Sequence, residues 1–359
     1  MKPQDTEYMQ QALSYAQKSR YITHPEPWVG CIIEKDDEIL GCGASEKAGG
    51  EHAEVVAIHA AKQAGFSLKG ATLYITFEPC CHRGRTPPCI DAIIRAEIHR
   101  VVIGRTDPAT KGRGVERLRK SGCEVEVGVL EEAVSHELRS YIYYTQHQSS
   151  YTVLKVVQSI DGCILGEKSW RIGDEAKKDA HMLRNSSQAI LISAHNVLHN
   201  NPNLTVDYAP LQGPAPLRVV LDRNDTLPLN AHIFQTEIAP TLCITSGNRN
   251  RNTALTNQGV DTISWNKPGS ISIPFVQNEL AKRGVLQLLV EGDAVSHFVE
   301  KQKFNELIVY VSPHLMGTSG KHISESWRVP SLPLMLNQVE RLDDSVKMSF
   351  QMISAATAS

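Results

Sequence analysis

Residues that can bind and use a zinc ion stand close together early in the chain: His52, Glu54, Cys80 and Cys89. One imidazole and two thiolates can hold zinc tetrahedrally and leave the fourth position open for water. Zinc lowers the pKa of such a water toward neutrality, and a glutamate two residues after the histidine can move protons between the water and a leaving group. These residue types in this order predict hydrolytic chemistry, with Glu54 as the proton carrier and not as a ligand.

The identity of the second thiol ligand is not decided by spacing alone. The order His-x-Glu followed by Pro-Cys-x-x-Cys is typical of zinc deaminases that act on nucleobases. Here the position of the second cysteine in that pattern holds Arg83, and the next thiols are Cys81 and Cys89. Cys81 is the weaker candidate because adjacent side chains rarely reach one metal ion. The alternative without a metal is that the thiols are buried core residues and His52 is a hydrogen-bonded polar residue.

The expected elements around these residues would bring them together. Residues 71–76 alternate and are rich in strand-forming side chains, which predicts a strand. Residues 78–80 and 87–89 each place proline at the start of an expected helix, and His52 and Glu54 open a third helical run. Both thiols are therefore expected near helix N-termini, where the partial positive charge favours the thiolate.

Length and composition limit the class of protein. A chain of 359 residues is long enough for two domains that each bury a core. Its net charge of −2 and its aromatic content of 6% do not favour nucleic-acid binding. The cysteines follow no disulfide pattern, the N-terminus has no apolar signal segment, and no apolar stretch approaches the length that spans a membrane. We expect a soluble protein of the reducing cytoplasm.

Alternating strands and helices predict two α/β units joined by a polar linker at 146–150. The first unit, 1–145, has a helix at 6–20, strands at 31–33 and 39–41 around a turn at Asp36-Asp37, strands at 71–76, 100–104 and 124–127, and a helix at 115–121. The second unit, 151–359, has strands at 151–157, 189–192, 217–222, 241–245, 286–291 and 307–311, and helices at 175–186 and 275–283.

With these residues in view, nearly the whole chain resembles the bifunctional riboflavin-biosynthesis deaminase/reductase family, RibD. In the first half the resemblance is carried by His52-Ala-Glu54, by 76–80, and by the run Gly-Arg-Thr-Pro-Pro-Cys at 84–89, which is specific within deaminases. The resemblance implies a cytidine-deaminase-like domain of three layers. It also implies zinc ligands at His52, Cys80 and Cys89, a proton carrier at Glu54, and substrate contacts at His82 and Arg85.

In the second half the resemblance rests on shorter stretches. These stretches are 154–155, 159–162, Trp170, 183–184, 204–205, 218–222 and 290–292. The resemblance implies a dihydrofolate-reductase-like α/β domain that uses NADPH. It also implies substrate contacts at Arg184, Leu204 and Glu291, and cofactor contacts at Trp170 and Gly292.

Both halves depart from the family pattern. In the deaminase half, Glu26 replaces an asparagine and Ser45 replaces a histidine on the substrate side. In the reductase half the departures are Lys168, Ile172, Asn200, Asp207 and Asp293. Asp207 removes a cation where a phosphorylated substrate needs one, and Asp293 adds negative charge to a loop that approaches the cofactor's phosphates.

Three hypotheses follow from these observations. The first is the family's reaction pair, in which a diaminopyrimidinone ribosyl phosphate is deaminated by zinc-dependent hydrolysis and its ribosyl chain is then reduced by NADPH to a ribityl chain. The second is a deaminase alone, on this or a related pyrimidine, with a second domain that serves only for packing or oligomerisation. The third is a zinc-stabilised binding module, against which the near-neutral charge argues. The resemblance further implies a homodimer formed through the second domain.

Overall fold

The computed structural model describes residues 2–82, 87–164, 172–327 and 331–352. The chain divides into two compact units, Met1–Gln148 and Ser149–Ser359. Each unit contains one sheet with helices packed on it, which confirms the predicted pair of α/β folds. In the described residues, no helix combines the length and the apolar character needed to cross a membrane.

A mixed sheet forms the centre of the first unit. Its described strands are β1 (Gly30–Lys35), β2 (Glu38–Ala44), β3 (Thr72–Phe77), β4 (Arg100–Arg105) and β5 (Glu124–Val127), in the order β2-β1-β3-β4-β5. β1 pairs antiparallel with β2 and β3, whereas β3, β4 and β5 run parallel. β3 and β4 are almost wholly buried, as parallel strands are when both faces of their sheet are covered.

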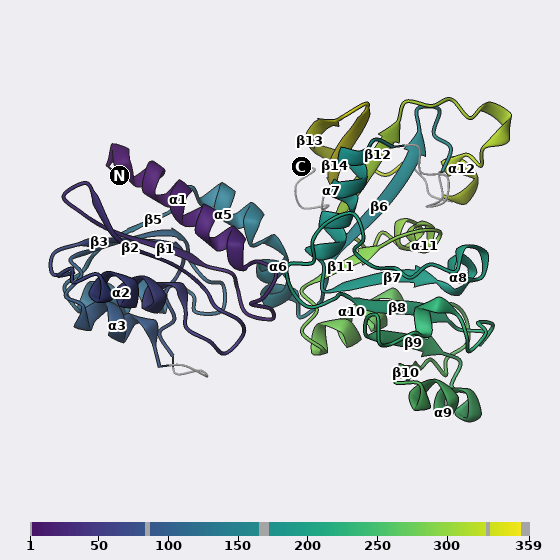
Figure 1. Ribbon diagram of the computed structural model, residues 1–359, viewed down its shortest axis with the longest axis horizontal. Coiled ribbons are helices and arrows are strands. Elements are labelled where there is room, and N and C mark those ends of the chain that lie inside the picture. The colour runs from purple at the N-terminus through teal and green to yellow at the C-terminus, as the bar shows by residue number, and fades with distance from the viewer. Residues whose placement is uncertain (1, 83–86, 165–171, 328–330, 353–359) are drawn as a thin grey trace. The chain divides into compact units, whose positions relative to one another are not determined.

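Helices cover both faces of this sheet and complete three layers (Figure 1). The helices are α1 (Pro3–Ser19), α2 (Ala53–Gln63), α3 (Cys89–Arg95), α4 (Arg113–Lys120), α5 (Glu131–Glu137) and α6 (Arg139–His147). α1 lies on one face, and α2 and α3 lie on the other (Figure 1). The sequence pattern predicts every strand of this unit, but it does not predict α5 or α6.

Glycines let α2 lie directly against the sheet. A Cβ atom at Gly43 would stand 2.2 Å from the carbonyl oxygen of Ala53 and 2.6 Å from the backbone nitrogen of Ala57. One turn further on, a Cβ at Gly41 would stand 2.5 Å from the carbonyl oxygen of Ala57. Because no side chain fits at either glycine, backbone contacts fix the first turns of α2 on β2.

One predicted helix of the first unit is wrong. Residues 78–80 follow β3 as irregular chain and do not begin a helix. The helix expected from the second proline pair does begin where predicted, at Cys89, the first residue of α3. Proline after a strand is compatible with a loop as well as with a first helical turn, so the residue type alone does not separate the two.

A mostly parallel sheet forms the centre of the second unit. Its described strands are β6 (Tyr151–Ser159), β7 (Ala189–Ser193), β8 (Leu217–Asp222), β9 (Thr241–Thr245), β10 (Asp261–Ser264), β11 (Gln287–Val290), β12 (Glu306–Ser312), β13 (Leu334–Leu342) and β14 (Ser345–Met352). The order is β10-β9-β8-β7-β11-β6-β12-β14-β13. Only the pairings of β14 are antiparallel among the described strands of this sheet.

The helices of the second unit include two that the sequence predicts and several that it does not. They are α7 (Asp174–Asn185), α8 (Ala194–Asn200), α9 (Arg249–Asn257), α10 (Ile273–Lys282), α11 (Ala294–Glu300) and α12 (Ile323–Ser326). α7 and α10 match the expected helices, whereas α8, α9 and α11 have only seven, nine and seven residues, too few to give a clear period. Apolar residues of α10 and α11 pack on the central strands and form the core.

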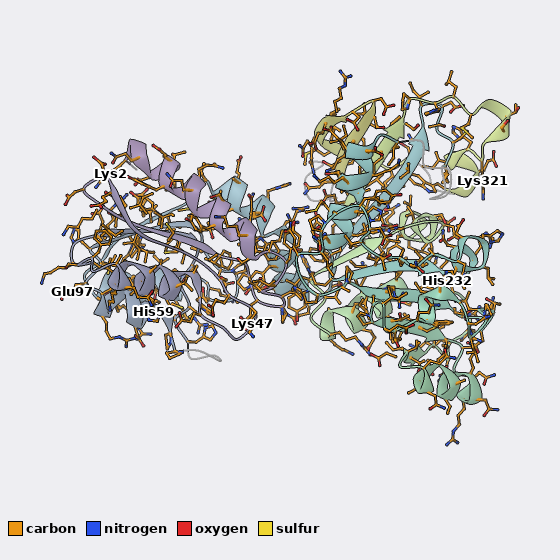
Figure 2. All side chains as sticks on the ribbon, in the orientation of Figure 1. Lys2, Lys47, His59, Glu97, His232 and Lys321 are labelled. Atoms are coloured by element: carbon orange, nitrogen blue, oxygen red, sulfur yellow. The ribbon has the colours of Figure 1, made fainter. Side chains whose placement is uncertain are left out.

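Polar residues cover the outside of both units. The residues labelled in Figure 2 are all exposed: Lys2, Lys47, His59, Glu97, His232 and Lys321. In contrast, several ionisable groups are buried, among them Glu54 in the first unit and Lys155, Arg184 and Glu291 in the second. Buried ionisable groups are costly unless they are paired or functional, so they direct attention to the two regions where they gather.

Candidate functional site

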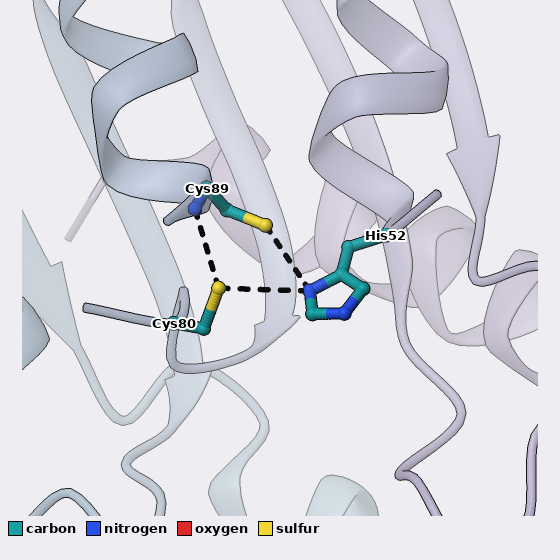
Figure 3. Close-up of side chains that lie close together, drawn as sticks. All are labelled: His52, Cys80 and Cys89. Carbon is teal, nitrogen blue, oxygen red and sulfur yellow. Dashed lines mark hydrogen bonds between the residues drawn. The ribbon is translucent and has the colours of Figure 1, made fainter. Parts of the chain in front are cut away.

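The side chains of His52, Cys80 and Cys89 meet at one point in the first unit (Figure 3). His52 is the N-cap residue of α2, Cys80 lies in the loop after β3, and Cys89 begins α3. The Nδ1 atom of His52 is 3.1 Å from Sγ of Cys89 and 3.7 Å from Sγ of Cys80. Within the described residues this is the one cluster of three or more histidine, cysteine or acidic side chains arranged to hold a metal ion.

Cys80 lies near a helix N-terminus although it belongs to no helix. Its Sγ accepts a hydrogen bond of 3.2 Å from the backbone N–H of Cys89, the first residue of α3. Such N–H groups carry the partial positive charge of the helix and favour a thiolate. The electrostatic expectation for Cys80 therefore holds, but through a neighbouring helix.

The three side chains form a donor set that fits zinc. Hydrogen bonds from Cys89, together with His52, lower the pKa of Cys80 to about 4. The hydrogen bond with Cys80 raises the pKa of His52 to about 9, and the same thiolate and burial raise the pKa of Cys89. One nitrogen and two sulfurs in mutual contact are typical zinc ligands, and metal binding would displace the protons held by His52 and Cys89.

Glu54 lies beside this cluster, in the first turn of α2. Its side chain is only 3% exposed and lines the same cavity as His52 and Cys80. Burial raises the pKa of the Glu54 carboxyl to about 7. A buried carboxyl of this kind, next to a metal site and not part of it, can accept and return a proton near neutral pH.

The cavity of the first unit has a volume of about 190 Å³ and contains both deaminase departures. Oε2 of Glu26 accepts a hydrogen bond of 3.2 Å from the Gly49 N–H. The Ser45 hydroxyl accepts from the N–H of Val29 at 3.1 Å, which holds it against the backbone. His82 is exposed and lines the cavity, whereas Arg85 lies outside the described residues.

Glu78 lines the same cavity and holds its wall together. Its Oε1 accepts from the N–H groups of Gly114 and Val115 at 2.7 and 3.3 Å. Its Oε2 accepts from the N–H of Asp107 at 2.9 Å and from the Thr110 hydroxyl at 2.8 Å. Four donors leave this carboxylate no capacity for a ligand, so Glu78 positions the loop before α4. The sequence analysis does not identify this role.

In the second unit, Glu291, Arg184 and Lys155 form a buried ion cluster. Nε and Nη2 of Arg184 donate to Oε1 and Oε2 of Glu291 at 2.9 and 2.7 Å. Nζ of Lys155 is 2.9 Å from Oε1 of Glu291. Burial acts to raise the pKa of Glu291, but the two cations outweigh it and hold the pKa well below its ordinary range. The carboxylate is therefore ionised at every physiological pH.

A larger cavity, of about 540 Å³, lies beside the ion cluster. Three of the residues expected to contact substrate or cofactor line it: Leu204, Glu291 and Gly292. Gly292 has φ +66, a backbone conformation that favours glycine, and a Cβ there would meet the Asn196 side chain, whose Nδ2 would stand 2.4 Å away. Arg184 does not line the cavity but donates from Nη1 to the carbonyl oxygen of Thr205 at 2.9 Å, next to Leu204.

Only some of the residues that depart from the family pattern in the second unit lie at this cavity. Asn200 and Asp293 line it, and Oδ1 of Asp293 accepts from the Ser193 hydroxyl at 2.5 Å. Asp207 is exposed, and its backbone N–H donates to Nδ1 of His181 at 3.0 Å. Ile172 is buried. Lys168 and Trp170 lie outside the described residues.

Lys155 is a candidate residue to which the sequence analysis assigns no role. It lines the large cavity with only 4% of its surface exposed, in the middle of β6. A signal is present in the sequence, because a lysine inside an apolar strand is rarely buried without a partner. The partner, Glu291, lies far along the chain, and local sequence patterns do not reveal it.

Two family models together match most of the chain. The model for the cytidine and deoxycytidylate deaminase zinc-binding region matches residues 2–105, and this range contains His52, Cys80 and Cys89. The model for the RibD C-terminal domain matches residues 150–348. The two matched ranges correspond to the two units of the structure.

Relatives of known name match almost end to end. The riboflavin biosynthesis protein RibD of Aquifex aeolicus is 38% identical and covers 87% of this chain and 88% of its own. RibD of Escherichia coli K12 is 33% identical, with coverage of 98% and 96%. These values are far above chance similarity over such lengths.

Solved structures agree with these matches. Acinetobacter baumannii RibD has a TM-score of 0.85 at 31% identity and covers 98% of this chain and 99% of its own. A diaminohydroxyphosphoribosylaminopyrimidine deaminase/5-amino-6-(5-phosphoribosylamino)uracil reductase from Thermotoga maritima has a TM-score of 0.86 at 31% identity, with coverage of 97% and 99%. The similarity therefore extends through both units and both candidate sites.

Proposed function

Because the chain belongs to the RibD family of riboflavin biosynthesis proteins, we propose that its two units catalyse the two reactions named for its relatives. The protein is a deaminase/reductase fusion of riboflavin biosynthesis. The first unit hydrolyses an amino group of diaminohydroxyphosphoribosylaminopyrimidine and releases ammonia. The second reduces the ribosyl chain of 5-amino-6-(5-phosphoribosylamino)uracil with NADPH. The assignment of the first reaction rests on one observation. The side chains of His52, Cys80 and Cys89 lie within ligand distance of one another, beside a cavity that Glu54 also lines.

The alternatives are less well supported. The deaminase-only hypothesis is not favoured, since the RibD C-terminal domain is matched over residues 150–348 and a cavity of about 540 Å³ lies in it. The binding-module hypothesis has no need of a buried glutamate beside the metal ligands, whereas Glu54 lies there with little solvent exposure. Hydrolysis does need such a residue.

His52, Cys80 and Cys89 are the proposed zinc ligands of the deaminase. Zinc in this position supplies Lewis acidity and makes a water molecule nucleophilic at neutral pH. Glu54 takes a proton from the attacking water and returns it to the amino group, which leaves as ammonia. The backbone N–H of Cys89 holds the Cys80 sulfur in place, and Glu78 holds the cavity wall. Together these contacts preorganise the site.

Substrate recognition in the first unit is proposed to involve His82, Arg85 and Glu26. Glu26 is fixed by the Gly49 N–H on one oxygen, and a carboxylate in this cavity can accept hydrogen bonds from pyrimidine amino groups. His82 and Arg85 follow the family pattern, in which this loop contacts substrate and the arginine resembles a phosphate-binding cation. Ser45 keeps its hydroxyl on Val29 and shapes the cavity.

NADPH is proposed to bind in the large cavity of the second unit, where Gly292 and, by resemblance, Trp170 contact it. Gly292 permits close backbone approach because it carries no Cβ, and its φ of +66 favours glycine. Arg184, Leu204 and Glu291 are the proposed substrate contacts, with Glu291 orienting the Arg184 guanidinium through two hydrogen bonds. The cofactor supplies hydride chemistry, and the protein supplies position and charge.

Cytoplasmic location and a homodimer remain proposals. All eight cysteines lie in the described residues, and all are free thiols, which suits a reducing compartment. The homodimer rests on the family resemblance alone. Sedimentation velocity on the purified chain measures the oligomeric state directly.

One mass-spectrometric assay tests both activities. Zinc-loaded protein is mixed with diaminohydroxyphosphoribosylaminopyrimidine, with and without NADPH. We expect a mass gain of about one unit without NADPH, as nitrogen is exchanged for oxygen, and about two further units with NADPH. A first shift without the second would contradict the reductase assignment alone. No shift in zinc-loaded protein would mean that Glu26 and Ser45 have changed the substrate.

A further inference from the structure

Two histidines stand on one face of α8, at the wall of the large cavity. His195 and His199 are four residues apart, and their ring centroids are 4.0 Å apart with an interplanar angle of 47°. Both side chains are exposed and both line the cavity. Neither residue takes part in the proposed reduction, so the pair needs a separate explanation.

A backbone contact sets the tautomer of the second ring. Nδ1 of His199 lies 2.9 Å from the carbonyl oxygen of His195. Because a carbonyl oxygen only accepts, Nδ1 carries the hydrogen and Nε2 of His199 keeps its lone pair for another partner. Metal-binding histidines typically donate their second N–H to a carbonyl or carboxylate in this way, which orients the ring and makes the ligand nitrogen more basic.

The spacing of the two rings suits one metal ion. Histidines at positions i and i+4 lie on the same side of a helix and are a known zinc-binding arrangement. Two nitrogens on one tetrahedral zinc lie roughly 3.4 Å apart, given Zn–N bonds of about 2.0–2.1 Å. The ring centroids are 4.0 Å apart at an interplanar angle of 47°, so the side-chain torsions must turn before both ligand nitrogens point at one ion. The carboxylate of Asp293 lines the same cavity and favours a cation there.

We propose that His195 and His199 form a second metal site, which binds a divalent ion of the imidazole-preferring class, such as Zn²⁺, Ni²⁺ or Cu²⁺. Among the residues that the structure describes, no third histidine, cysteine or acidic group completes a tighter cluster around the pair. The site is therefore a two-ligand chelate with coordination positions open toward the cavity. It is more weakly binding and more exchangeable than the site of the first unit.

Calorimetric titration of the zinc-loaded full chain with Zn²⁺, in phosphate-free buffer, tests the proposal. We expect a second equivalent to bind to the wild-type protein. His195→Ala and His199→Ala each leave a single ligand and weaken this second binding by more than about tenfold. His232→Ala is the matched control, because His232 is another exposed histidine of the same unit (Figure 2) and should leave the titration unchanged.

The outcomes separate clearly. Absence of a second equivalent in the wild type, or a second equivalent that binds with unchanged affinity in His195→Ala and His199→Ala, would overturn the proposal. Thermal unfolding of each variant checks that it is folded, and since both positions are exposed, we expect unchanged midpoints. His195→Gln and His199→Gln provide a second pair that removes the ligand nitrogen and keeps a polar side chain.

A coupled titration deepens the inference, and this step rests on the proposed binding of NADPH in the same cavity. A cation on the cavity wall with open coordination positions attracts phosphate oxygens, so we expect added Zn²⁺ to tighten NADPH binding by about fivefold or more. The effect should vanish in His195→Ala. Normal zinc binding without any NADPH binding would contradict the proposed reductase function, whereas NADPH binding that is indifferent to zinc would contradict this coupling.

Discussion

Glu54 and Glu291 each line the cavity of their unit, but the pKa of Glu54 is raised whereas the pKa of Glu291 is lowered. Glu54 lies beside the His52 and Cys80 side chains with its pKa raised by burial to about 7. Glu291 instead lies between Arg184 and Lys155, which together outweigh burial and lower its pKa. A group whose pKa is close to neutral can exchange protons with a ligand, and a group fully paired with cations cannot.

The difference follows from where the chemistry originates. Hydrolysis at zinc needs ligands and a proton carrier from the protein itself, so the reactive groups must be left without permanent partners. Hydride transfer is performed by NADPH, so the protein needs a rigid, charged frame around the cofactor. The ion cluster of the second unit is such a frame. The predictions below test this contrast between a chemically active and a structurally supporting set of charges.

Removal of zinc should produce the largest difference between the activities of the two units. Treatment with a strong chelator is expected to abolish ammonia release, because no residue of the first unit replaces the Lewis acid. Oxidation of NADPH with the deaminated pyrimidine as substrate should persist at saturating NADPH, since the hydride comes from the cofactor and loss of a metal from His195 and His199 only weakens NADPH binding. Ammonia and NADPH assays on one preparation measure both. Equal loss of the two activities would show that the units do not function independently.

The variant Glu54→Gln should lower deaminase turnover by about 10²–10⁴-fold, the usual contribution of a general acid–base residue. Zinc content, measured by inductively coupled plasma mass spectrometry, should stay at the wild-type level because Glu54 is not a ligand. Glu132→Gln changes an exposed glutamate on α5 and serves as the control. Turnover that survives in Glu54→Gln would assign the proton transfer to another group.

The variant Glu291→Gln should act on stability first and on chemistry second. It leaves Arg184 and Lys155 buried without a full counter-charge, which costs about 3–5 kcal/mol of unfolding free energy. Denaturant unfolding of the second unit and NADPH oxidation should both decline, while ammonia release is retained. Glu300→Gln, at an exposed position that ends α11, is the matched control. A stable but inactive Glu291→Gln protein would show that this carboxylate is catalytic and not a supporting charge.

Mild acid should weaken both units, because each contains a histidine whose pKa is lowered by burial, His24 in the first and His181 in the second. Burial, with Arg184 and Lys155, lowers the pKa of His181 to about 4. Since the unfolded chain binds this proton near pH 6.5, stability is full above that pH and is lost as the pH falls toward 4. Between pH 7 and pH 5 the loss is about 2 kcal/mol. Thermal unfolding of the zinc-loaded protein at both pH values measures it.

The variant His181→Gln should remove the contribution of His181 to this pH dependence and leave that of His24. In the first unit, burial acts to raise the pKa of Asp5, but its hydrogen bonds to Arg100 outweigh burial and lower that pKa. The stabilisation by Asp5 is present above about pH 4 and is lost only below it, so this pair does not contribute between pH 7 and 5. An unchanged pH dependence in His181→Gln would assign the acid sensitivity to other groups.

The zinc site can be predicted from the sequence because its residue types are rare and close together. His52-Ala-Glu54 and Pro79-Cys80 are informative on their own, and the structure brings His52, Cys80 and Cys89 within ligand distance of one another. The error lies in the local structure at 78–80, which is a loop. The expected electrostatic environment of Cys80 is nevertheless present. Its sulfur accepts a hydrogen bond from the N–H of Cys89, at the N-terminus of α3, and not from a helix of its own.

The ion cluster of the second unit cannot be predicted from the sequence in the same way. Lys155 and Glu291 are distant in the sequence and become partners only because β6 and β11 are neighbours in the sheet. Strands such as 217–222 and 241–245 are predicted from their apolar residues with the observed bounds, since burial on both faces leaves a strong pattern. Short surface helices such as α8 leave no such pattern, and this is where His195 and His199 escape notice.

The contact of Gly43 with α2 makes this glycine sensitive to substitution. A methyl group at this position would meet the backbone of Ala53, and any relief would move the first turn that follows His52 and contains Glu54. Substitutions at Gly43 should therefore disturb the position of Glu54, although Gly43 touches neither metal nor substrate. A survey of variants that scored only the reacting side chains would pass over this residue.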